Sequence, residues 1–172
     1  MKRPSYLRGS VAIGLFCLAA DQLTKYLALV HVPSGEVRGS GFFSLRLVHN
    51  AGAAFSFASS ATYAITALAL VVVLVLPALV TRTDSRAWAC GLGLIWGGAA
   101  GNLVDRLLRS PGFGRGEVVD FIGWGNWFTG NVADIALGLG IGLVVVLSFC
   151  HIDFASETVS EGNEGRRAAT AE

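Results

Sequence analysis

Four long apolar runs, at about 10–30, 61–80, 88–108 and 131–151, dominate the hydrophobic pattern of the chain. A helix of about 20 residues is about 30 Å long, which matches the hydrocarbon core of a bilayer. The pattern therefore predicts four transmembrane helices.

The first run could be mistaken for a secretory signal peptide, because basic residues precede it. The run is too long for a signal peptide, however, and it contains Asp21 and Lys25. It is also not followed by an Ala-x-Ala cleavage site. We therefore expect a retained helix.

The segment between the first two runs has the pattern of a small hairpin. Polar and apolar residues alternate in Ser44-Leu45-Arg46-Leu47, as in a half-buried strand, and Gly39-Ser40-Gly41 separates this stretch from Glu36-Val37-Arg38. The predicted fold class is an all-α membrane protein, with four transmembrane helices and a small extracytoplasmic β-hairpin or cradle. Residues 1–152 are expected to form a single domain. The polar, acidic residues 153–172 are expected to be a disordered cytoplasmic tail.

Composition and charge support a membrane class. Only 15% of the residues are charged and 53% are hydrophobic, whereas about 25% of an average soluble chain is charged. The net charge of +1 gives no reason to expect a nucleic-acid partner. Basic residues concentrate at the N-terminus, in the short loop after the second run and in the tail, which favours both termini in the cytoplasm. Three cysteines in apolar stretches and three scattered histidines predict no disulfide, no metal site and no cofactor.

Polar residues from five segments converge on the outer side of this topology. They are Asp21 and Lys25 in the first helix, His49 and Asn50 at the end of the hairpin, Asn102, Asp105 and Arg106 in the third helix, Asp120 in the following loop, and Asn131 and Asp134 at the start of the fourth helix. A charged group inside a span costs roughly 2.5–3.5 kcal/mol on insertion scales, so such groups are candidates for function. A functional site at the outer membrane face is therefore predicted.

Simpler structural roles compete with function for several of these residues. Asp21 and Lys25 are four apart and can form an ion pair that eases insertion, an explanation as good as a functional one. Asp105 is expected to be an interfacial partner of Arg106. Asn131 suits the N-cap of the fourth helix, a role compatible with a place in the site.

Further structural expectations concern exposed arginines and glycine stripes. Arg109 and Arg115 are expected to face solvent or lipid headgroups. Gly93, Gly97 and Gly101 share one face of the third helix, as Asp134, Gly138 and Gly142 share one face of the fourth. These two stripes predict that the third and fourth helices press together.

Asp120 and Asp134 are harder to explain structurally. Asp134 lies in a helical span with no basic residue within four positions, and Asp120 lies in the apolar stretch Val118-Val119-Asp120-Phe121-Ile122. Two acids in dry surroundings favour a pair that shares one proton.

Five segments in order resemble the lipoprotein signal peptidase family, also called signal peptidase II. They are Asp21-Gln22-Leu23-Thr24-Lys25, Val48-His49-Asn50-Ala51-Gly52-Ala53-Ala54-Phe55-Ser56, Gly97-Gly98-Ala99-Ala100-Gly101-Asn102-Leu103-Val104-Asp105-Arg106, Val118-Val119-Asp120-Phe121-Ile122 and Asn131-Val132-Ala133-Asp134. The resemblance implies catalysis by Asp120 and Asp134. The residues expected to order the site or hold substrate are Asp21, Lys25, Asn50, Asn102, Arg106 and Asn131. The loop 110–116 is longer than usual in the family, and Ile135 stands where members often have Ser.

The resemblance also implies the reaction. Members of the family are aspartyl endopeptidases of the bacterial inner membrane, so this activity is expected here. They remove the signal peptide of diacylglyceryl-modified prolipoproteins by cutting just before the lipidated cysteine. The expected partners are this lipid-modified preprotein and membrane lipid, and the expected state is a monomer with its site towards the extracytoplasmic face. One alternative is a small transporter or proton-coupled channel with Asp21, Lys25 and Asp134 as relay groups, although the chain lacks the inverted repeat common in transporters. Another is a scaffold subunit whose polar cluster binds a partner helix.

Overall fold

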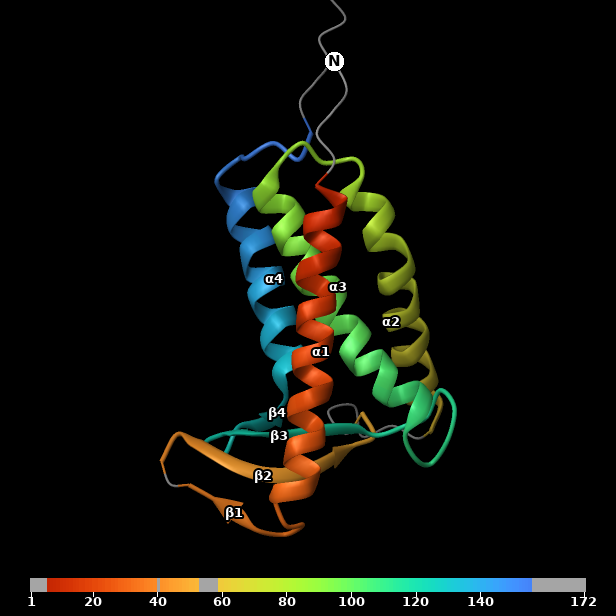
Figure 1. The fold of residues 1–172 in the computed structure, drawn as a ribbon, viewed down its shortest axis with the longest axis vertical. Helices are drawn as coiled ribbons and strands as arrows, with labels where there is room; N and C mark the ends of the chain where they lie inside the picture. The colour runs from red at the N-terminus through yellow and green to blue at the C-terminus, as the bar shows by residue number, and fades with distance from the viewer. Residues whose placement is uncertain (1–5, 40, 53–58, 156–172) are drawn as a thin grey trace, which may run out of the picture.

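The computed structural model describes residues 6–39, 41–52 and 59–155 and contains four helices long and apolar enough to cross a membrane. They are α1 (Leu7–His31), α2 (Ser59–Val80), α3 (Arg86–Leu108) and α4 (Val132–Phe149). The helices stand side by side with a small sheet across one end, and both described ends of the chain lie at the other end (Figure 1). The predicted fold class is thus confirmed. Most of the tail predicted to be disordered, residues 156–172, lies outside the described residues.

Large apolar side chains cover the outer surfaces of the helices. Phe16 on α1, Leu74 on α2 and Leu139 on α4 are 74%, 68% and 63% exposed. A water-soluble domain would bury most such side chains, whereas lipid tails are as apolar as the side chains themselves. These faces are therefore suited to contact lipid.

Helix α3 is the centre of the bundle, because α1, α2 and α4 all pack against it. In its apolar window 56% of the residues are buried, against 11–22% in the other three helices. Its glycines allow the close approach: a Cβ added to Gly97 would lie only 2.5 Å from the carbonyl oxygen of Gly14 on α1. On the α2 side, the indole Nε1 of Trp96 donates a 2.9 Å hydrogen bond to the carbonyl of Val73.

The predicted close contact between α3 and α4 is confirmed, but the two glycine stripes do not meet in it. Gly93, Gly97 and Gly101 face α1, with Gly101 also against Ala133 of α4, and a Cβ added to Gly138 or Gly142 of α4 would meet nothing within 4 Å. The contact between α3 and α4 uses other small residues: Gly91 and Gly98 on α3, and Gly140 on α4. Glycine spacing shows which residues share a face of a helix, but it does not show which neighbour that face meets.

Four antiparallel strands form the sheet, in the order β1-β2-β3-β4. The hairpin of β1 (Val37–Arg38) and β2 (Phe43–Asn50) agrees with the sequence pattern, whereas β3 (Val118–Trp124) and β4 (Phe128–Gly130) were not predicted. Pairing of β2 with β3 places Val48 opposite Asp120 and Asn50 opposite Val118. The sheet therefore brings Asn50 next to Asp120, although the two are 70 positions apart.

Candidate active site

Asp120 lies on β3 with only 2% of its surface exposed. Its two carboxylate oxygens accept hydrogen bonds from two amide side chains. Asn50 Nδ2 donates to Oδ2 at 2.9 Å and Asn131 Nδ2 donates to Oδ1 at 2.6 Å. The carbonyl oxygen of the Asn50 amide accepts from the backbone N–H of Gly52 at 2.8 Å, which fixes the direction of the amide. Asp120 is therefore held on both sides by oriented donors.

Asp134 lies in the first turn of α4 and forms a capping box with Asn131. The Asn131 side chain accepts from the Asp134 backbone N–H at 3.0 Å, and Asp134 Oδ2 accepts from the Asn131 backbone N–H at 3.1 Å. The other oxygen, Oδ1, accepts from Asn102 Nδ2 at 2.9 Å. The prediction that Asn131 caps this helix is confirmed, and the cap holds Asp134 in place.

One residue, Asn131, contacts both acids, so Asp120 and Asp134 are neighbours at the sheet end of the bundle. The pKa of Asp120 is raised from 3.8 to about 6, chiefly because the carboxyl group is buried. The negative charge of Asp134 also raises this pKa, whereas the hydrogen bonds from Asn50 and Asn131 and the charge of Lys25 lower it. An acid with such a pKa can give or take a proton near neutral pH.

A buried ion cluster lies behind the two acids, between α1 and α3. Lys25 Nζ lies 2.8 Å from Asp21 and 2.8 Å from Asp105, and all three side chains are fully buried. The predicted ion pair of Asp21 and Lys25 is thus confirmed. Asp105 turns to Lys25 and to Arg109, which lies 2.8 Å away, instead of to Arg106. Residues adjacent on a helix point in different directions, whereas Asp105 and Arg109 share a face.

Two arginines on α3, Arg106 and Arg109, make contacts near the two acids. Arg106 Nη1 donates to the Gly116 carbonyl at 3.5 Å, and its guanidinium also interacts with the charges of Asp120 and Asp105. Contrary to expectation, Arg109 is the ion-pair partner of Asp105, and its side chain is only 27% exposed.

The loop before β3 also contacts α2. Arg115 lies over the Tyr63 ring, and Thr66 on α2 donates to the Gly114 carbonyl at 2.9 Å. The loop therefore packs against α2.

Sequence reasoning missed the role of Gln22. Its amide Nε2 lies within hydrogen-bonding distance of Asp21 Oδ2, the Gly101 carbonyl and Asp105 Oδ1, at 3.1–3.2 Å. Gln22 stands inside the first segment of the family resemblance, next to Asp21. It carries no charge, so the cost of burying charges did not single it out.

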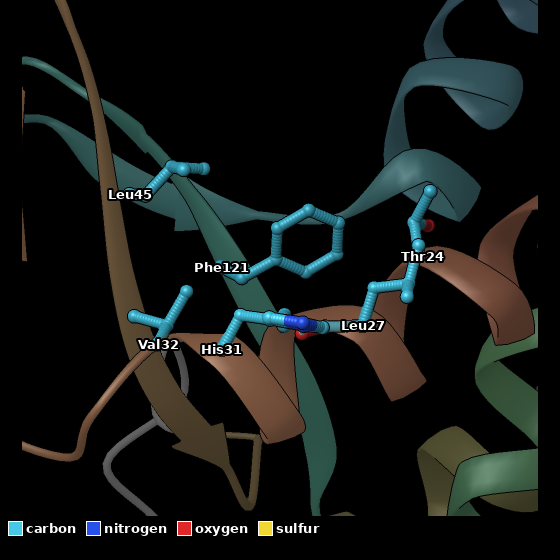
Figure 2. Close-up of a pocket in the computed structure, with 7 residues that line it drawn as sticks. Thr24, Leu27, His31, Val32, Leu45 and Phe121 are labelled. Atoms are coloured by element: carbon cyan, nitrogen blue, oxygen red, sulfur yellow. Dashed lines mark hydrogen bonds between the residues drawn. The ribbon is translucent and has the colours of Figure 1, made fainter.

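An apolar pocket of about 370 Å³ lies on the other side of β3, between the C-terminal end of α1 and the sheet. Figure 2 shows Phe121 among Leu27, Val32 and Leu45, with His31 at one side. Successive residues of a strand face opposite sides, so Phe121 turns to the pocket while Asp120 turns to the bundle. None of the described residues that line the pocket is an acid, and we therefore place the candidate chemistry at Asp120 and Asp134.

Comparisons with known proteins place this chain among its relatives. A model of the family described as signal peptidase (SPase) II matches residues 13–150. The lipoprotein signal peptidase of Mycobacterium avium is 44% identical over 88% of this chain and 84% of that protein, and the lipoprotein signal peptidase of Mycobacterium leprae is 43% identical over 98% and 82%. A bacterial membrane enzyme solved at 1.9 Å resolution by the in meso method has a TM-score of 0.74 at 25% identity, over 86% of this chain and 97% of that one.

Proposed function

Because this chain belongs to the signal peptidase II family, we propose that it is a membrane aspartyl endopeptidase with Asp120 and Asp134 as its catalytic residues. Its relatives are named for lipoprotein signal peptides, and the substrate proposed here is a diacylglyceryl-modified preprotein cut just before the lipidated cysteine. The observation that carries the proposal is the contact of Asn131 with both acids. It favours hydrolysis over the transporter and scaffold alternatives, neither of which needs two acids joined in this way.

The reaction uses one ionised and one protonated carboxyl group. Two neighbouring carboxylates do not both ionise cheaply, so the pair retains one proton near neutral pH. The raised pKa of Asp120 favours this residue as the holder of the proton, although the titration belongs to the pair. Asp134 then takes a proton from a water molecule, which attacks the scissile carbonyl carbon. Asp120 hydrogen-bonds the developing oxyanion, and a proton passes to the leaving amine as the peptide bond breaks.

We assign the sheet end of the bundle to the extracytoplasmic side and both termini to the cytoplasm of a bacterial inner membrane. Support comes from the basic residues, since Arg82 and Arg86 lie at the opposite end from the sheet. In this orientation the acyl chains of the substrate remain in the outer leaflet while its scissile bond reaches the acids. We further propose that residues 1–152 form the peptidase domain, that 153–172 form a cytoplasmic tail, and that the enzyme works as a monomer in contact with membrane lipid, without nucleic acid.

Asparagine substitutions test the catalytic pair, because they keep the shape of each side chain and remove its ability to exchange a proton. Asp120→Asn and Asp134→Asn should each abolish cleavage of a purified diacylglyceryl-modified preprotein, measured as the shift to the shorter product on a gel. Glu36→Gln, which changes an exposed acid paired with Arg38, serves as the matched control and should cleave normally. Normal cleavage by either aspartate variant would remove that residue from the catalytic role.

A further inference from the structure

All three N–H groups of the Lys25 ammonium have a partner. Two are the carboxylates of Asp21 and Asp105, each 2.8 Å away, and the third is Asn102 Oδ1 at 3.1 Å. An ammonium group has three donors and no acceptor, so Lys25 is satisfied without water. These partners come from both α1 and α3, so the ammonium group joins the two helices.

The two carboxylates held by Lys25 each reach the backbone immediately before a proposed catalytic residue. Asp21 Oδ1 accepts from the backbone N–H of Ala133 at 2.9 Å, one residue before Asp134. Asp105 Oδ2 accepts from the backbone N–H of Val119 at 3.1 Å, one residue before Asp120. The cluster of three charges thus holds the start of α4 and the start of β3 at once.

The third contact of Lys25 sets the orientation of the Asn102 amide. Asn102 Oδ1 accepts from Lys25 at 3.1 Å and from Asn131 Nδ2 at 3.3 Å, which leaves its Nδ2 to donate to Asp134 Oδ1. A flipped amide would place its NH₂ group against the ammonium and a second amide donor, and would present an oxygen to the Asp134 carboxylate. The ammonium therefore determines that Asp134 meets a donor.

We propose that Lys25 is a positioning residue that sets the separation of Asp120 and Asp134, by joining the two carboxylates that hold their backbones and by orienting the Asn102 amide. The inference rests on the proposed catalytic pair, and it assigns the cluster a part in the reaction beyond helix insertion. Among the described residues, no hydrogen bond or ion pair joins Lys25 to either acid, so it positions them through Asp21, Asp105 and Asn102. Its positive charge also acts on Asp120 through space.

Two variants of the full-length enzyme test the role of Lys25. Lys25→Met removes the ammonium and keeps much of the apolar stem. The double variant Lys25→Met/Asp21→Asn keeps the cluster balanced in charge, because Arg109 then faces Asp105 as its single counterion. Arg109→Gln is the matched control, since Arg109 also pairs with Asp105 but is partly exposed and does not contact Asn102. Cleavage of a diacylglyceryl-modified preprotein gives kcat and KM, and helicity in detergent reports folding.

The expected result is a fall in kcat of about tenfold or more with KM within about twofold, because displaced acids impair the chemical step and leave substrate contacts in place. Arg109→Gln should stay within about threefold of the parent. In an Asn102→Ala background the loss caused by the Lys25 change should be smaller, since the route through Asn102 is already lost and coupled residues are not additive. An unchanged kcat, an undiminished loss in that background, or failure of the charge-balanced variant to fold would each overturn the proposal. Asp120→Asn and Asp134→Asn test the catalytic pair separately from this outcome.

Discussion

Replacing Asn131 separates two roles that this one side chain combines. It caps α4 through the Asp134 backbone N–H, and it donates to Asp120 Oδ1 at 2.6 Å. Ser is as good an N-cap as Asn, but its shorter side chain does not reach Asp120, whereas Ala supports neither contact. Asn131→Ser should therefore keep the stability of the helix and lose the hydrogen bond, and Asn131→Ala should lose both.

The structure sets the size of both effects. Asn131 is 1% exposed and Asp120 is 2% exposed, so water has little access to replace the lost donor. A buried acceptor left without its donor costs about 1–3 kcal/mol, which corresponds to about 5- to 150-fold in rate if the bond is made in the transition state. Both variants should lose this much in kcat. Loss of the cap should in addition make Asn131→Ala less stable than Asn131→Ser by about 0.5–2 kcal/mol.

Two measurements check this prediction on the same purified samples. Initial rates of cleavage of a diacylglyceryl-modified preprotein at saturating substrate give kcat. Loss of helicity in mixed micelles of increasing SDS content gives the relative free energy of unfolding. Cleavage by Asn131→Ser at the parental rate would refute the role assigned to the contact with Asp120, and equal stabilities of the two variants would refute the role assigned to the cap.

Two further predictions concern stability. The folded state binds a proton on Asp120 more tightly than the unfolded chain, because folding raises the pKa from 3.8 to about 6. The free energy of unfolding should therefore decline as the pH rises from 3.8 to about 6. Asp120→Asn should make this decline shallower. Equal pH slopes would contradict this. Gly97→Ala should lower the free energy of unfolding by about 1–3 kcal/mol, because the added Cβ would meet α1. The control Gly142→Ala should change it little, because a Cβ at Gly142 meets no atom within 4 Å. Equal losses of stability for the two variants in SDS titrations would argue against the close contact at Gly97.

Features that depend on residues close in sequence could be predicted. The lengths of the apolar runs gave the four helices, with the fourth ending at Phe149 instead of near residue 151. Asn131, followed three positions later by Asp134, predicted the N-cap of the fourth helix. The spacing of Asp21 and Lys25 gave their ion pair.

Features that depend on pairing between distant segments could not be predicted. Strand β3 pairs with β2, and Asn50 and Asp120 in these strands are 70 positions apart. The short apolar stretch of β3 has no period that would distinguish a strand from a loop at the membrane surface. Asp105 had a cation next to it in sequence, and only the packing of α1 on α3 makes Lys25 its partner. The neighbour of each glycine face was undetermined for the same reason.

Asn131 lies at the start of α4, which is synthesised after α1, α2 and α3. A chain that has emerged only as far as β3 carries Asp120 with Asn50 within reach, but it lacks both the second acid and the amide that links the two. If the proposed pair is catalytic, such a nascent chain has no peptidase activity. Helix α4 completes the pair, so we expect cleavage only after this helix has been inserted.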